Sequence, residues 1–200
     1  MPKAFTQSQI EQIRFALLQK GREYFIRYGL KKTSVDDIAR AVGIAKGSFY
    51  RFFDSKEALL LEIHKASEEK LRTDLMCKFE KIKEPDEKLR FFLKSSFAIL
   101  EEDPLILAVF GRGELDSFSG FISSKQYEEH YRENIVFMKD LIQRWQEEGI
   151  IRQVDAEVTG NLIASAFFIY LQKETLGTEM YNKVTDMLIE TLVNYLSEKG

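Results

Sequence analysis

Residues 33–56, TSVDDIARAVGIAKGSFYRFFDSK, decide the fold of the N-terminal part of this chain. Apolar residues recur at helical spacing through the first half of the stretch. Ser34 precedes them as a helix N-cap, with Asp37 three residues later in the position of a capping-box acid. Gly43 follows the last of them, where a left-handed C-cap favours glycine. The pattern predicts a short helix that ends in a sharp turn.

A second short helix is predicted from Lys46 to Phe53. Phe49, Phe52 and Phe53 fall on one side of it at spacings of three and four residues, which leaves polar and basic side chains on the other. Gly47 costs about 1 kcal/mol relative to alanine within a helix, so we expect something to approach the backbone closely there. Two helices joined by a short turn with glycine form a helix-turn-helix, whose second helix lies in the major groove of DNA.

Side chains that suit DNA gather in this stretch. Lys46, Arg51 and Lys56 carry charges that neutralise phosphates, and Ser48 and Tyr50 can donate hydroxyl hydrogen bonds to phosphates or base edges. The hydroxyl residues before the first helix add amides at a helix N-terminus, which favour anions. The predicted DNA-binding residues are Thr33, Ser34, Lys46, Gly47, Ser48, Tyr50, Arg51 and Lys56.

Several of these motifs together resemble the TetR-type (TetR/AcrR) transcriptional regulators. The similarity is carried by Tyr24-Phe25, Gly29, Phe53 and the segments TSVDDIA, AVG, KGSFY and SKEAL between residues 33 and 59. It covers about a quarter of the chain and fades after Leu61. The resemblance implies an all-α dimer, with an N-terminal three-helix DNA-binding domain and a C-terminal helical bundle that binds an effector and releases the operator. It also implies that the predicted DNA-binding positions, Arg51 excepted, contact DNA.

Two residues depart from the common pattern of that family. Many relatives have serine where this chain has Ala45, and alanine is a poorer N-cap by about 1 kcal/mol. The recognition helix is therefore expected to fray until DNA orders it. Many relatives have histidine at the position of Arg51, so a contact made there by an imidazole would pass to a longer, permanently charged side chain.

Charge is distributed unevenly along the 200 residues. The net charge is −3, which argues against a nonspecific nucleic-acid binder. Residues 1–55 nevertheless carry 10 Lys/Arg against 5 Asp/Glu, while the rest carries 19 against 27. A basic head on an acidic body is expected when one end faces phosphate, although a lopsided solvated surface would look similar.

Composition also indicates where the protein works. A single cysteine allows no intrachain disulfide and fits a reducing cytoplasm. The N-terminus lacks the apolar stretch of a signal peptide. The most apolar segment, residues 162–171, is too short to span a membrane. We expect a cytoplasmic protein that makes no membrane contact.

The remaining chain predicts further helices and two domains. We expect residues 1–54 to form the helix-turn-helix domain and residues 55–200 a helical ligand-binding and dimerisation domain. Helices are predicted from Thr6 to Gly29, with a capping partner at Gln9, and over residues 55–83, 85–102, 121–149, 155–174 and 178–200, with a short helix after Pro104 and a connection over residues 111–120.

The last two helices are predicted to hold two copies together. The middle of the first, LIASAFFIYL, is apolar nearly all round and so must be covered on every side. A four-helix interface between two subunits would cover it. The alternative is that both helices are buried within the bundle of one subunit.

A DNA-binding repressor is the leading functional hypothesis, because no enzyme, metal or cofactor motif is present and the two histidines lie far apart in sequence. The expected partners are a double-stranded DNA operator and a small apolar effector, aromatic or acyl in character. Two alternatives stay open: a protein of the same fold controlled by a protein partner, and a helical carrier of apolar molecules. Aromatic and apolar residues that suit an effector pocket, or an ordinary core, are Phe97, Leu107, Phe110, Phe118, Phe121, Phe137, Trp145, Phe167 and Tyr170.

Overall fold

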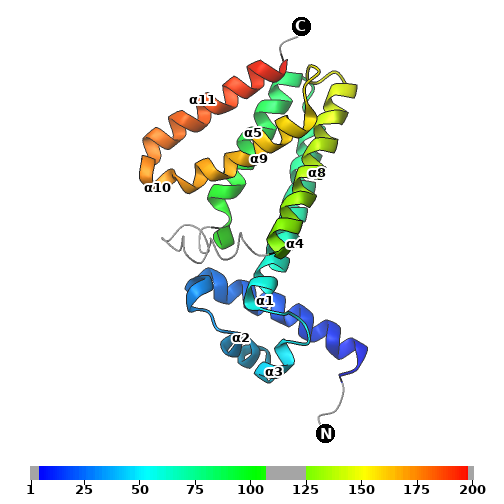
Figure 1. The fold of residues 1–200 in the computed structure, drawn as a ribbon, viewed down its shortest axis with the longest axis vertical. Helices are drawn as coiled ribbons and strands as arrows, with labels where there is room; N and C mark the ends of the chain where they lie inside the picture. Colours follow the sequence, from blue (N-terminus) through cyan, green and yellow to red (C-terminus); the bar gives the residue numbers. More distant parts are fainter. Residues whose placement is uncertain (1–4, 107–124, 198–200) are drawn as a thin grey trace. The chain divides into compact units, whose positions relative to one another are not determined.

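A computed structural model describes residues 5–106 and 125–197, except the side chains at positions 126, 166, 167 and 171. All regular structure in these ranges is helical, as expected for the all-α class (Figure 1). The helices are α1 (Gln7–Lys32), α2 (Val35–Val42), α3 (Lys46–Phe49), α4 (Lys56–Phe79), α5 (Pro85–Glu102), α8 (Lys125–Glu147), α9 (Ala156–Leu171), α10 (Lys173–Leu176) and α11 (Thr178–Ser197).

The described residues form two compact units. The N-terminal unit comprises residues 5–69, 104–106 and 125–127, and the C-terminal unit comprises residues 70–103 and 128–197. The division falls within α4 and α8. The N-terminal unit therefore extends further along the chain than residue 54, where the sequence-based boundary of the DNA-binding domain stays a prediction.

The first helix begins at the predicted capping box. The Gln9 amide donates to Thr6 Oγ1 at 3.3 Å, and the Thr6 amide donates to Gln9 Oε1 at 2.9 Å. At the other end Gly29 has φ 76° and interrupts the helical backbone, but helical turns resume and carry α1 to Lys32. Glycine is suited to this kink because it adopts positive φ without the steric cost that other residues incur.

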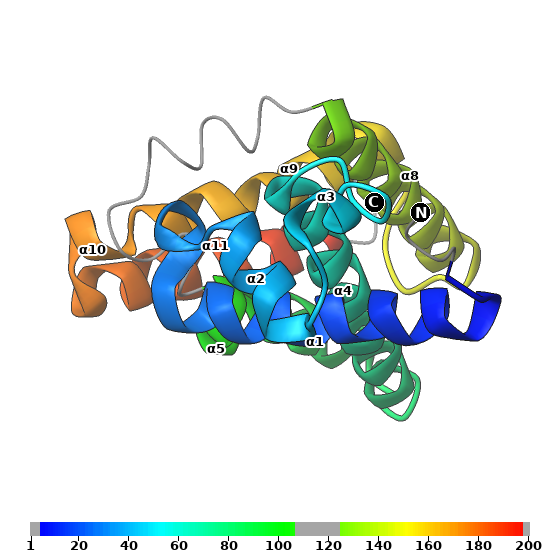
Figure 2. The ribbon, with the colours of Figure 1, turned by 90° about the horizontal axis from the view of Figure 1, so that it is seen from below.

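The next two helices form the predicted helix-turn-helix. The Asp37 amide donates to Ser34 Oγ at 3.1 Å, and Gly43 ends α2 with φ 78°. α2 packs against α1, and α3 against α2, as Figures 1 and 2 both show. The predicted bounds of the second helix were wrong at one end. α3 ends at Phe49, because the backbone then tightens into turns in which Arg51 and Phe52 bond to carbonyls three residues back.

Aromatic and aliphatic side chains from α1 to α4 meet in the core of the N-terminal unit. Phe25, Ile38, Phe49 and Leu59 are fully buried there, and Phe53 is 5% exposed. The predicted inward side of residues 46–53, here called the recognition segment, is thus confirmed. Burial of this side fixes which side chains of α2 and α3 remain outside.

The C-terminal unit is built around Trp145 of α8. Its indole stacks on Phe79 with ring centroids 5.1 Å apart and meets Phe92 edge-on at 5.0 Å. Side chains of α5, α9 and α11 complete this core. Gly149, with φ 69°, lies in the turn that follows α8. Asp155 caps α9, as predicted, by accepting hydrogen bonds from two backbone amides.

Some predicted features fall on residues that the structure does not describe. These are the connection over residues 111–120 and the start of the helix predicted from residue 121. The helix predicted to reach residue 83 ends earlier, at Phe79, and the one predicted to reach residue 174 breaks at Gln172, where α10 begins. None of the helices within the described ranges is both long and apolar enough to cross a membrane.

Candidate nucleic-acid interface

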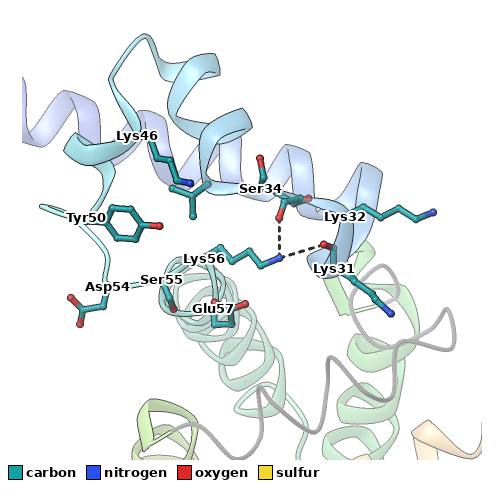
Figure 3. A pocket seen from close by; sticks show the side chains of 11 residues that line it. Lys31, Lys32, Ser34, Lys46, Tyr50, Asp54, Ser55, Lys56 and Glu57 are labelled. Atoms are coloured by element: carbon teal, nitrogen blue, oxygen red, sulfur yellow. Dashed lines mark hydrogen bonds between the residues drawn. The ribbon is translucent and has the colours of Figure 1, made fainter.

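The outer side of the helix-turn-helix carries a hollow of ≈ 380 Å³. It is bounded by the end of α1, the start of α2, the recognition segment and the start of α4. Figure 3 shows Lys46 and Tyr50 reaching into it from one side and Lys56 crossing its floor. The residues that line it are Lys31, Lys32, Thr33, Ser34, Val35, Lys46, Tyr50, Asp54, Ser55, Lys56 and Glu57.

Five of the eight predicted DNA-binding residues line this hollow: Thr33, Ser34, Lys46, Tyr50 and Lys56. The other three belong to the same recognition segment. Gly47 is exposed, and a Cβ built on it would meet no atom within 4 Å. Packing inside the described structure therefore does not require glycine at this position, and the close approach of DNA to its backbone stays a prediction.

Arg51 is held at the edge of the segment by an aromatic ring. Its guanidinium lies 5.1 Å from the centroid of the Phe5 ring, and Phe5 in turn lies 6.4 Å from the ring of Phe52. A cation over an aromatic face is attracted by the ring quadrupole. Phe5, two residues before the start of α1, thus stabilises the exposed guanidinium of Arg51.

Thr33 and Lys56 both bond to backbone carbonyls of the N-terminal unit, and their contact with DNA stays a prediction. Thr33 is 2% exposed, and its hydroxyl donates to the carbonyls of Gly29 at 2.7 Å and Tyr24 at 3.2 Å. Lys56 Nζ donates to the carbonyl of Leu30 at 2.7 Å. The sequence could not show that backbone carbonyls accept hydrogen bonds from both side chains.

Lys31 and Lys32 also line the hollow and were not predicted. They lie in the last turn of α1, and in Figure 3 their ammonium groups point away from the hollow. Two consecutive cations before Thr33 were the signal in the sequence. With Lys46 and Lys56 they give the lining four basic residues against two acidic ones, Asp54 and Glu57 among the eleven.

Arg40, on the exposed side of α2, is committed to its own helix. Its hydrogen bond to Asp36, followed by the charges of Asp36 and Asp37, raises the pKa of its guanidinium. Because these carboxylates already balance its charge, Arg40 adds less positive potential to the surface than the lysines around the hollow. The basic character of the interface therefore rests on the hollow and on Arg51.

The residues predicted for an effector pocket are only partly described. Leu107, Phe110, Phe118 and Phe121, and the side chain of Phe167, lie outside the described residues. Phe97, Trp145 and Tyr170 are each at most 6% exposed, and Phe137 packs against the core of the C-terminal unit. In this structure Trp145 and Phe97 are core residues, and their role at a pocket stays a prediction.

The fold and the exposed basic segment place this chain in the helix-turn-helix class of proteins. Residues 17–63 match the family described as bacterial regulatory proteins of the tetR family. The match covers about a quarter of the chain and agrees with the resemblance to the TetR-type regulators seen in its sequence.

Curated relatives match only part of this chain. The chain is 48% identical over 50 residues to the HTH-type transcriptional repressor KstR2 of Rhodococcus jostii, which is 25% of this chain and 24% of that protein. In two other relatives the match covers 46% of their length, so the chain spans about half the length of the first curated relatives it matches.

Solved structures match nearly the whole chain. A TetR-family transcriptional regulator from Pectobacterium atrosepticum matches with a TM-score of 0.73 and 21% identity, over 98% of this chain and 100% of that one. Thermus thermophilus FadR, a TetR-family transcriptional repressor in complex with lauroyl-CoA, matches with a TM-score of 0.69 and 19% identity, over 94% and 96%. At this identity the similarity establishes the fold alone.

Proposed function

We propose that this protein is a transcriptional repressor that binds a two-fold symmetric DNA operator as a homodimer, and that it is not an enzyme. The observation that carries the proposal is the surface of the recognition segment, where Lys46, Gly47, Tyr50 and Arg51 are all exposed while Phe49 is fully buried. One side of the segment is thus locked into the core and the other offers charge, a hydroxyl and uncovered backbone. These groups suit phosphates and base edges.

Each remaining predicted contact has a definite role in this proposal. Ser34 brings the N-terminus of α2 to the surface, where free amides and the helix dipole favour a phosphate oxygen. Ser48 lies on α3 and donates to a base edge or phosphate. Thr33 and Lys56 line the hollow beside Ser34, and their contacts with DNA stay predictions.

Exposed apolar side chains of the C-terminal unit support a homodimer through α9 and α11. Val158 and Leu162 of α9 are 64% and 49% exposed, and Met180 and Met187 of α11 are 51% and 73% exposed. Their exposure in one chain argues against the alternative that both helices are buried within a single subunit. Large exposed apolar patches mark interaction sites, and a two-fold interface would bring the same patch of two copies together.

We further propose that a small apolar effector in the C-terminal unit releases the DNA. The aromatic residues predicted for this role and the acyl ligand of Thermus thermophilus FadR support an apolar effector of aromatic or acyl character. Such a ligand shifts the equilibrium only by its differential affinity for the DNA-bound and released states. The alternative hypothesis is that a protein partner controls DNA binding in place of a small effector. Testing whether acyl compounds release a bound duplex distinguishes the two hypotheses.

Fluorescence anisotropy with the purified full chain tests the DNA-binding proposal. A double variant, Lys46→Ala with Tyr50→Ala, is expected to lose affinity for duplexes selected by the wild-type protein while its circular dichroism spectrum stays unchanged. Lys78→Ala serves as the control, because this exposed lysine lies on α4 in the C-terminal unit. Retained affinity in the double variant would favour the carrier hypothesis, in which the N-terminal unit mediates protein contacts.

A further inference from the structure

The ammonium group of Lys56 is bonded to the end of α1 and to the turn between α1 and α2. Its Nζ donates to the carbonyl oxygens of Leu30 at 2.7 Å and Thr33 at 2.9 Å, with Lys31 O at 3.5 Å (Figure 3 draws the bonds to Thr33 and Lys31). The last carbonyls of a helix have no partner within that helix, and a cation is favoured beside them. A lysine ammonium has three donors and no acceptor, so it matches this cluster of carbonyls.

The same turn is held from its other side by Thr33. The Thr33 hydroxyl donates to the carbonyl of Gly29 at 2.7 Å, across the kink at the end of α1. Ser34 follows directly and caps α2 through the amide of Asp37. Lys56 therefore contributes to fixing the backbone that sets where α2 begins.

Lys46 offers a direct contrast on the opposite wall of the hollow. Its side chain is exposed, and among the described residues its ammonium has no hydrogen bond or ion pair. A phosphate can bind it without displacing any protein contact. A phosphate that bound Lys56 would compete with carbonyls at 2.7 and 2.9 Å.

We infer that Lys56 is a positioning residue for DNA binding and does not contact the phosphate backbone. This inference rests on the proposed function and assigns Lys56 a role that the family resemblance does not. Lys56 holds the turn between α1 and α2, and through it the N-terminus of α2, in the geometry that DNA requires. Lys46 carries the phosphate contact from the same hollow.

Two matched variants separate these roles. Lys56→Met and Lys46→Met each remove one positive charge and keep an unbranched stem of similar length. For each protein we would measure the melting temperature, and the anisotropy of one selected duplex at several salt concentrations. The slope of log affinity against log salt falls in magnitude by about 0.9 for each phosphate contact that is lost.

The expected results differ in kind. Lys46→Met leaves the melting temperature unchanged and lowers the slope by about 0.9. Lys56→Met lowers the melting temperature by about 4–8 °C, because charge-assisted hydrogen bonds are lost. It also weakens binding at every salt concentration, by about tenfold, and leaves the slope unchanged.

A slope that falls by about 0.9 in Lys56→Met would overturn the inference, whatever the melting temperature. An unchanged melting temperature together with unchanged affinity would overturn it as well. Should Lys56→Met fail to fold, Lys56→Arg keeps the charge on a longer, planar group that cannot replace a compact ammonium. Full affinity and stability in that variant would count against positioning. A wild-type protein that binds no duplex would instead overturn the proposed function, which distinguishes the two failures.

Discussion

Replacing Gly47 with alanine separates what the recognition segment needs for folding from what it needs for DNA. A Cβ at this position meets no atom within 4 Å, and Gly47 is not among the glycines with positive φ. Alanine is favoured over glycine in a helix, by about 0.5–1 kcal/mol. Gly47→Ala should therefore raise the free energy of unfolding by about 0.5 kcal/mol. This value is at the lower end of the range because α3 is a single turn.

The same substitution should weaken DNA binding. If DNA approaches the backbone at Gly47, the added methyl group overpacks the interface, at a cost of about 1–3 kcal/mol, or about 5- to 150-fold in affinity. Urea unfolding followed by circular dichroism measures the first effect, and fluorescence anisotropy with a selected duplex measures the second. A variant that is more stable and binds more weakly is the expected outcome.

Gly43→Ala is the matched control for this experiment. Its Cβ also meets no atom within 4 Å, but its φ of 78° is strained for alanine, so stability should fall by about 1–2 kcal/mol. Undiminished DNA affinity in a folded Gly47→Ala protein would refute the reasoning, because it would mean that nothing approaches the backbone of α3 closely.

Three further substitutions test other parts of the structure. Ala45→Ser should add the missing side-chain cap of α3, raise stability by about 1 kcal/mol and strengthen DNA binding; no gain in either would show that the helix is already ordered. Trp145→Ala should lower the urea-derived stability by about 3–5 kcal/mol, because a buried indole stacked on Phe79 is removed, whereas a loss below 1 kcal/mol would contradict its core role. In the variant Glu190→Gln, the free energy of unfolding should depend less on pH in acid than in the wild-type protein. The Arg90 hydrogen bond lowers the pKa of Glu190 below 4.5, so the stability it contributes is present above that pH and is lost as the pH falls through the lowered pKa. An unchanged acid-unfolding profile would refute this role.

Local signals in the sequence predicted most of the N-terminal unit. Helix caps are decided by a few neighbouring residues, and the bonds made by Thr6, Ser34 and Asp155 were readable for that reason. The role of Gly43 could also be predicted, since a left-handed C-cap requires a residue that tolerates positive φ. The buried side of the recognition segment followed from the spacing of its phenylalanines.

Features that depend on tertiary contacts were not readable in the same way. The end of α3 at Phe49 depends on how Phe52 and Phe53 pack on their neighbours, which spacing alone does not determine. The hydrogen bonds of Lys56 depend on carbonyls 23 to 26 residues away in the sequence. An exposed lysine and a lysine that caps another helix look the same in a sequence. The structure therefore adds hydrogen bonds of Lys56 that the sequence did not predict, while its place at a DNA-binding surface stays a prediction.

Binding-site selection from a random duplex library tests the central claim most directly. The purified full chain would be mixed with the library at near-physiological salt, and the retained duplexes sequenced. A dimer whose two recognition segments read equivalent half-sites should enrich a two-fold symmetric consensus, with half-sites about one DNA turn or a near multiple apart. Failure to enrich any sequence would contradict the account, because the surface around Lys46 and Tyr50 would then serve some purpose other than reading an operator.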